Sequence, residues 1–345
     1  MARMIDIAER AGVSLKTVSR VLNNEPHVKD EVRDRVRRAA EDVGYVPSTS
    51  ARRLAGSRNY AIQLISHSSR SNYVNAIQFG AVQACQSLGY QLIVSLLAGA
   101  DKMDWSELYK NAEILVKTAR PDGIILVPPL SNDGRLAEVL QQLGVPVARV
   151  DPRAIDGSTI VVRINERQAA CELVEYLLQQ GHTRIAFIRG KEDQNATHER
   201  FAGYQDALKA ANIDLDPSLV LPGTFDFPSG FSGGEHLIRL DDSPTAIFAA
   251  NDDMAAGVLM AALRNGVSVP NDLSIVGFDD ADVADKTWPA LTTVRQPLLE
   301  IGEAAASELI RLVSNNGPVR AETLNRVLDH EIVYRSSAGA PPNAS

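Results

Sequence analysis

The chain has 345 residues, a length that predicts two or three domains. Hydrophobic residues make up 45% and charged residues 23%, a balance typical of a globular protein and not of a disordered chain. No apolar run reaches the roughly 18 residues of a membrane span, and Asp6, Glu9 and Arg10 interrupt the place where a secretory signal has its apolar core, so we expect a cytoplasmic protein with no membrane partner. Residues 1–60 hold 12 Lys and Arg against 8 Asp and Glu, whereas the rest holds 23 against 35, which fits a chain whose first region meets a polyanion.

The first region predicts a small helical domain. Three helices are expected, over residues 4–11, 15–23 and 29–43. In the first, Ile5, Ala8 and Ala11 share one face, Gly12 allows a left-handed turn, and Ser14 can cap the second helix. Two short helices joined by such a turn form a helix-turn-helix, which lays its second helix in a major groove of DNA, although a plain packing module would show the same pattern.

The second helix carries residues suited to DNA. Lys16 and Arg20 can donate to guanine O6 and N7, the commonest base-specific contact. Hydroxyl and amide side chains, which suit phosphate contacts, occur at Ser14, Thr17, Ser19 and Asn23.

Four segments of this region together resemble the head of the LacI/GalR family of repressors: 5–14, 17–23, 44–47 and 51–56. In that family the positions of Leu15 and Lys16 read bases, and that of Arg20 contacts the major groove. The resemblance also implies that residues 48–55 fold into a hinge helix on DNA, with Leu54 wedged into the minor groove. It therefore implies double-stranded operator DNA as a partner and the following contacts: Ser14, Leu15, Lys16, Thr17, Ser19, Arg20, Asn23, His27, Ser48, Ala51 and Leu54.

From residue 61 onward, apolar strands alternate with amphipathic helices. Strands are expected at 62–65, 92–97, 123–127, 145–150, 185–188, 246–249 and 273–278. Helices are expected at 74–88, 105–118, 135–143, 166–178, 200–210, 234–240 and 254–265. Two such series predict two doubly wound α/β lobes, with a ligand between them at the carboxyl ends of parallel strands.

Five later segments resemble the effector domain of the same family, which is similar to periplasmic sugar-binding proteins: 184–188, 200–204, 244–252, 274–279 and 289–297. The fold class expected is thus an all-α helix-turn-helix head followed by a periplasmic-binding-protein-like α/β domain. The expected parts are a DNA-binding domain at 1–46, a hinge at 47–59, an effector and dimerisation domain at 60–335 and a disordered tail at 336–345. Lobe 1 is expected at about 60–160 plus 296–318, and lobe 2 at about 161–290 plus 320–335. In the family the chain crosses between lobes three times, which would return the helix after Pro297 to the first lobe.

The resemblance also indicates where an effector would bind. The position of Arg200 grips the effector, and its planar fork suits vicinal hydroxyls or a carboxylate. Phe225 is the expected aromatic that stacks on a sugar face, with Phe227 as an alternative register. The segment 66–73 departs from the family pattern, so the contacts chosen there rest on their place after the first strand. The full set of expected effector contacts is Ser66, His67, Tyr73, Asp151, Arg200, Phe225, Asn251 and Asp279.

Residue patterns for other functions are missing. There is no nucleophile elbow, phosphate loop or metal-spaced Cys/His set, so neither an enzyme nor a cofactor or metal is expected, and Cys85 and Cys171 are interpreted as buried thiols. We expect a homodimeric, ligand-responsive repressor of carbohydrate-utilisation genes that binds a pseudo-palindromic operator. The alternative effector is a nucleobase, and the alternative class of protein is a solute-binding protein for uptake. The residues do not decide whether the effector releases the protein from DNA or promotes its binding. The tail lacks the leucine heptads of a coiled-coil tetramer.

Overall fold

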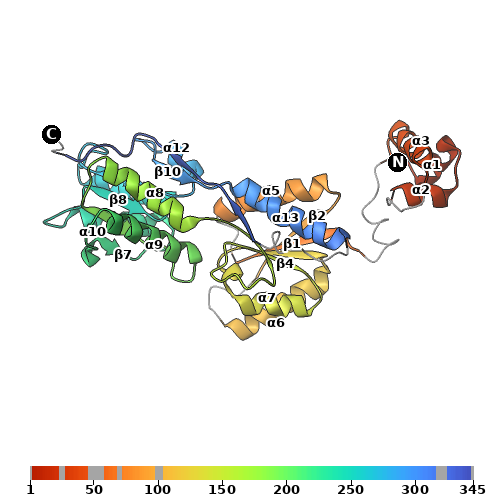
Figure 1. The fold of residues 1–345 in the computed structure, drawn as a ribbon, viewed down its shortest axis with the longest axis horizontal. Helices are drawn as coiled ribbons and strands as arrows, with labels where there is room; N and C mark the ends of the chain where they lie inside the picture. The colour runs from red at the N-terminus through yellow and green to blue at the C-terminus, as the bar shows by residue number, and fades with distance from the viewer. Residues whose placement is uncertain are drawn as a thin grey trace. The chain divides into compact units, whose positions relative to one another are not determined.

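The computed structural model describes residues 2–22, 28–45, 58–67, 72–97, 104–315 and 325–342. They form two compact units, one ending at Tyr60 and the other beginning at Ala61 (Figure 1). Most of the expected hinge, 47–59, lies outside the described residues. So do five of the expected DNA contacts: Asn23, His27, Ser48, Ala51 and Leu54.

The first unit is the predicted three-helix domain. Its helices are α1 (Met4–Ala11), α2 (Leu15–Leu22) and α3 (Asp30–Asp42). Gly12 ends α1 with a φ of +63°, the left-handed turn expected there. The core differs in one position: Ile7, fully buried, replaces Ile5, which is 47% exposed. On a helix with 100° per residue these two side chains point in clearly different directions, and only Ile7 meets the other helices.

The second unit begins with a lobe built on a six-stranded sheet in the order β11-β5-β4-β3-β1-β2, with parallel pairing throughout. Its strands are β1 (Ala61–Ser66), β2 (Gln91–Leu96), β3 (Gly123–Leu126), β4 (Val147–Val150), β5 (Ile160–Ile164) and β11 (Asn325–Leu328). Its helices are α5 (Asn72–Ser87), α6 (Trp105–Ala119), the short η2 (Leu130–Asn132), α7 (Gly134–Gln142) and α13 (Leu298–Asn315).

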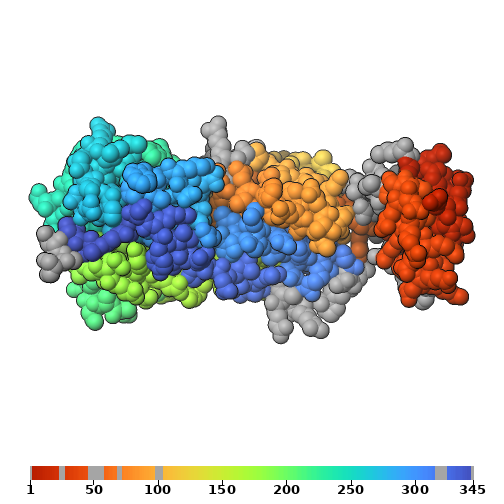
Figure 2. Space-filling model, turned by 90° about the horizontal axis from the view of Figure 1, so that it is seen from above, coloured from red at the N-terminus to blue at the C-terminus, as the bar shows by residue number. Residues whose placement is uncertain are grey.

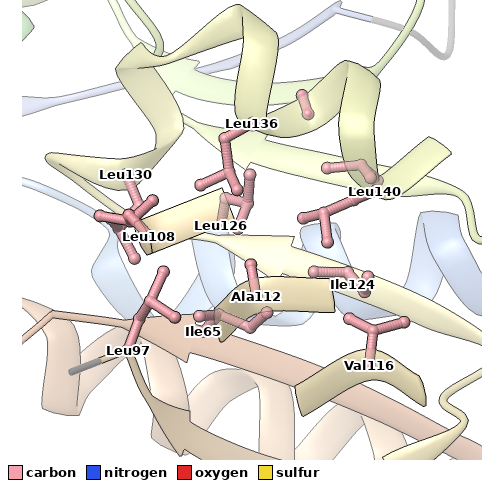
Figure 3. Close-up of a cluster of buried hydrophobic side chains, with 12 residues drawn as sticks. Ile65, Leu97, Leu108, Ala112, Val116, Ile124, Leu126, Leu130, Leu136 and Leu140 are labelled. Atoms are coloured by element: carbon pink, nitrogen blue, oxygen red, sulfur yellow. The ribbon is translucent and has the colours of Figure 1, made fainter. Parts of the chain in front are cut away.

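Helices cover both faces of this sheet, as expected for parallel strands. On one face, Leu108 of α6 and Leu136 of α7 pack on Ile65 and Leu126 of the sheet (Figure 3). On the other face, α5 and α13 lie side by side (Figure 1). Their backbones meet so closely that a Cβ on Gly80 would fall 1.9 Å from the Leu299 carbonyl oxygen.

The second lobe has a parallel sheet in the order β7-β6-β8-β9, with a separate antiparallel pair, β10 and β12. The strands are β6 (Ile185–Ile188), β7 (Val220–Leu221), β8 (Ala246–Ala249), β9 (Ser274–Val276), β10 (Thr293–Arg295) and β12 (Glu331–Val333). The helices are α8 (Glu166–Gln179), α9 (Asn195–Ala210), η3 (Pro217–Leu219), α10 (Phe227–Ile238), α11 (Asp252–Arg264) and α12 (Asp282–Lys286).

The chain passes between the two lobes three times: after β5, after β10 and after β11. The return of α13 to the first lobe agrees with the expectation. The lobe boundaries differ, because β5 and β11 pair with each other in the first sheet, whereas 161–164 and 325–328 were expected in the second lobe. A buried apolar strand has the same residue pattern in either lobe, so only the pairing distinguishes them.

The last described residues are packed, in contrast to the disordered tail expected at 336–345. Ser337 is fully buried, and its hydroxyl donates to the Ile275 carbonyl and accepts from the Thr292 backbone N–H at 2.8 Å. The Gly339 carbonyl accepts from His182 Nε2 at 2.8 Å. Figure 2 shows the dark-blue C-terminal residues lying along the light-green residues of α8, where the rings of Tyr334 and Tyr176 are 4.7 Å apart. The residues that make these contacts are short and polar. A run of such residues has the composition of a disordered tail, so composition alone does not predict the packing.

Candidate functional site

The helix α2 presents a polar surface from a fixed position. Val18 and Val21 are buried against α1 and α3, which leaves Leu15, Lys16 and Arg20 exposed on the other side. Leu15 is 48% exposed, a large apolar side chain at the start of a helix that the unit leaves uncovered. An uncovered leucine beside two cations suits contact with a partner better than contact with water.

The start of α2 is held by its hydroxyl residues. Ser14 Oγ accepts from the Thr17 backbone N–H at 3.2 Å and lies 2.9 Å from Thr17 Oγ1, so this pair caps the helix. Ser19 is half-buried on the following turn. Elsewhere in the unit, Arg10 pairs with Asp42 at 2.9 Å and links α1 to α3. Both partners are exposed, so packing around Val18 orients α2 far more than this pair does.

The second unit contains a cavity of about 780 Å³ that residues of both lobes line. Seven of the eight expected effector contacts are among the lining residues: His67, Tyr73, Asp151, Arg200, Phe225, Asn251 and Asp279. Asp151 follows β4, Asn251 follows β8 and Asp279 follows β9, so the carboxyl ends of parallel strands bring them together. Ser66 is not in the lining. It is the last residue of β1, 1% exposed, and its carbonyl accepts from the Leu97 N–H at 2.9 Å.

Arg200, on α9, is the centre of a buried charge network. It is 3% exposed, and its guanidinium lies 3.7 Å from the centre of the Phe278 ring. Nε donates to Glu166 Oε2 at 2.7 Å, and Nη2 donates to Glu166 Oε1 at 3.2 Å, so the two side chains form a bidentate pair. Nη1 donates to the Ala250 carbonyl at 2.5 Å, and Nη2 also donates to Asp279 Oδ1 at 3.2 Å.

Glu166 is a lining residue that the sequence analysis did not identify. It occupies the first turn of α8, directly after the strand β5, and is 3% exposed. A buried carboxylate requires a cation and hydrogen bonds, which Arg200 supplies. The sequence does place this acidic residue directly after Asn165, the N-cap of α8. Acidic residues at that position usually stabilise the start of a helix and have no further role, so the position alone does not identify a cavity residue.

Two further carboxyls lie close to this pair. Burial raises the pKa of Asp279 to about 6, against the opposing effect of the Arg200 cation. Burial, followed by the charge of Glu166, raises the pKa of Asp151 well above its ordinary value, while Asn195 Nδ2 donates to Asp151 Oδ1 at 3.1 Å. The same carboxyls face the Tyr73 hydroxyl, whose pKa burial raises well above 10. The cavity wall thus concentrates acceptors.

The aromatic wall comes from the loop before α10. The Phe225 ring lies against Gly190, where an added Cβ would fall 1.9 Å from the ring. The Phe225 backbone has a φ of +60°, and its carbonyl accepts from Asn251 Nδ2 at 3.1 Å. Asn251 Oδ1 accepts from the Met254 N–H at 3.0 Å and caps α11. Phe227, the alternative register, also lines the cavity but is more exposed and begins α10.

Acidic side chains outnumber cationic ones in the lining of this cavity. Among the described residues that line it, two are cationic, Lys191 and Arg200, and eight are acidic: Asp151, Glu166, Asp226, Asp252, Asp253, Asp279, Asp280 and Asp282. Some of the acids serve the fold. Asp252 accepts from Thr293 Oγ1 at 2.7 Å and from the Ala281 N–H at 2.8 Å, which joins α11 to the loop that follows β9.

Two further observations concern other kinds of site in the part of the chain that the structure describes. No group of three or more His, Cys, Asp or Glu residues there is arranged to hold a metal ion. Nor does a described helix combine the length and apolarity that crossing a membrane requires. Cys85 is buried, as expected, whereas Cys171 on α8 is half-buried.

Comparisons with known proteins match both units. Residues 3–48 match the family model described as bacterial regulatory proteins, lacI family, and residues 174–338 match a periplasmic binding protein-like domain. The probable HTH-type transcriptional repressor ExuR of Bacillus subtilis is 35% identical over 320 residues, covering 91% of this chain and 92% of the relative. The ribose operon repressor of Escherichia coli is 31% identical over 315 residues, covering 91% and 94%. The crystal structure of the lac repressor dimer bound to operator and the anti-inducer ONPF aligns with a TM-score of 0.74 and 26% identity, covering 98% and 99%.

Proposed function

This chain belongs to the LacI family of bacterial transcriptional repressors, and on that premise we propose that it binds a pseudo-palindromic operator as a homodimer and is switched by a small sugar in the cavity of its second unit. The observation that carries the proposal is the pairing of two surfaces in one chain. One is the exposed cationic side of α2, and the other is the cavity around Arg200. A regulator that binds an operator works in the cytoplasm, where the chromosome lies.

For DNA binding, we assign base contacts to Leu15, Lys16 and Arg20 because they lie on the uncovered side of α2. The hydroxyls of Ser14, Thr17 and Ser19 are assigned to phosphate. We extend the assignment to Asn23, His27 and the hinge residues Ser48, Ala51 and Leu54 on the family resemblance alone.

For the effector, the acceptor-rich wall suits the many hydroxyl donors of a sugar, and Phe225 offers an apolar face for a sugar ring. The name of the ribose operon repressor supports this class of ligand. Arg200, Asn251, Asp151 and Asp279 are the proposed polar contacts.

For the dimer, exposed apolar side chains of the first lobe supply a candidate interface. They are Phe79 on α5, Leu88 after it, and Val94 and Leu96 on β2, one of the two edge strands of the sheet. Apolar residues on a lone edge strand favour contact with a second chain. The operator-bound relative is itself a dimer.

The test is a mobility shift on operator fragments taken from the protein's own chromosomal neighbourhood, with a scrambled sequence of equal length as control. We expect binding that weakens steeply with salt and changes when the effector sugar is added. Equal affinity for the operator and the scrambled DNA would contradict the DNA-binding part. A shift that no sugar of a broad panel alters would contradict the effector part.

A further inference from the structure

The hydrogen bonds of Arg200 are almost fully used inside the protein. A guanidinium has five N–H groups. Nε and Nη2 donate three of them to Glu166 and Asp279, and Nη1 donates one to the Ala250 carbonyl. One Nη1 hydrogen remains for a ligand, which is too few for the bidentate grip that a carboxylate or phosphate requires.

The Arg200–Glu166 pair resists opening. Both side chains are 3% exposed, so swinging Arg200 toward a ligand would leave Glu166 buried without its cation. Phe278 holds the guanidinium from one side at 3.7 Å, which further limits its movement.

Unpaired acceptors face the cavity beside this pair. Asp151 and Asp279 each use one carboxyl oxygen, Oδ1, for the hydrogen bonds that the described residues make to them. Their Oδ2 atoms have no hydrogen-bond partner there, although Asp151 is 4% exposed and both residues line the cavity. Asp253, half-buried in the same wall, has no hydrogen-bond or ion-pair partner in the described chain.

We infer that Glu166 determines the charge selectivity of this cavity: by occupying Arg200 it makes the effector a hydroxyl- or ammonium-bearing sugar and rejects uronates and sugar phosphates. The inference rests on the proposed function and narrows its ligand class. An anionic ligand would meet Asp151, Asp279 and Asp253 in the wall. With Arg200 occupied by Glu166, only Lys191, an exposed side chain, remains among the described lining residues to offset their charge. A neutral sugar donates its hydroxyls to the same oxygens, and an ammonium group adds favourable charge.

The test measures ligand binding by calorimetry and thermal melting without DNA. The probes are two matched sets: glucose, glucosamine and glucuronate, and galactose, galactosamine and galacturonate. The variants are Glu166→Gln, which removes the charge at nearly constant volume, and the control Glu175→Gln, at an exposed position on the same helix outside the cavity. We expect the wild type to bind each uronate at least about tenfold more weakly than the neutral or amino sugar of its set, and E166Q to gain at least about tenfold in affinity for a uronate. E175Q should match the wild type.

Two results would overturn the inference. One is wild-type binding of a uronate as tight as that of its neutral parent. The other is a folded E166Q that gains no response to either uronate. The wild-type ranking decides the question even if E166Q does not fold. Failure of the DNA-binding part of the proposed function is a separate outcome, because it is seen only in the mobility shift, whereas this experiment contains no DNA. A wild type that binds none of the six sugars would contradict the effector part of the proposed function, and this inference with it.

Discussion

The two units of the molecule use arginine in opposite ways. In the first unit Arg20 lies on the exposed side of α2, and apolar residues such as Val18 hold that helix in place. In the second unit Arg200 is buried and is itself a structural element, bonded to Glu166, Asp279 and the Ala250 carbonyl. If both arginines bind as proposed, binding and stability are separable in the first unit and joined in the second.

The largest expected effect would come from removing Arg200. Arg200→Met leaves Glu166 buried and uncompensated, so the free energy of unfolding of the second unit should fall by about 3–5 kcal/mol. Chemical denaturation measures this loss. The double variant Arg200→Met with Glu166→Leu should recover most of it while effector binding stays lost. An Arg200→Met protein as stable as the wild type would show that Arg200 does not stabilise the second unit.

A somewhat smaller effect concerns pH and Asp279. Its folded pKa of about 6 lies above the ordinary 3.8, so the native state holds this proton up to about pH 6 while the unfolded chain releases it near pH 4. The stability that this group contributes is therefore fully present below about pH 4 and is lost as the pH rises to 6, by up to about 3 kcal/mol.

Asp279→Asn cannot titrate, so its unfolding free energy should fall less than that of the wild type between pH 4 and pH 7. Denaturation curves at several pH values in that range measure the difference. Parallel stability profiles for the two proteins would mean that Asp279 is ionised throughout, as an exposed carboxylate would be.

The smallest change in free energy is expected at the surface of the first unit. Lys16→Ala should weaken operator binding by about 1–3 kcal/mol, if Lys16 donates to a guanine, and should leave the melting temperature within error. Fluorescence anisotropy with operator variants measures the first quantity and calorimetry the second. Glu9→Ala, at an exposed position of α1, is a matched surface control. A large loss of stability in K16A would show that an exposed side chain of α2 also stabilises the first unit.

The same contrast explains what could be predicted from the sequence. An exposed helix face follows from the spacing of a few apolar residues, so the polar side of α2 was predictable from local pattern. The neighbouring residues Ile5 and Ile7 are both plausible core residues, and only the packing of three helices selects Ile7.

In the second unit the alternation of strands and helices predicted two lobes. The family resemblance, together with the ends of the strands, predicted seven cavity residues. The pairing of Arg200 with Glu166 joins residues 34 positions apart, and no local pattern encodes such a contact. The strand β5, which places Glu166, was missed although four of its five residues, Ile160–Ile164, are apolar and β-branched. Short strands such as β10 and β12 owe their existence to each other and not to their own propensity.

The three passages of the chain between the lobes have a consequence for how such a regulator can change over generations. A single recombination event near codon 60 would exchange the whole first unit and join the same proposed effector site to a new DNA-binding unit. The lobes cannot be exchanged in this way, because each is assembled from separated stretches of the gene, with β11 and β12 only two residues apart yet in different lobes. The proposed effector site must therefore be inherited as one piece and altered one residue at a time, and a substitution at a position such as Glu166 would be a short path to a different effector.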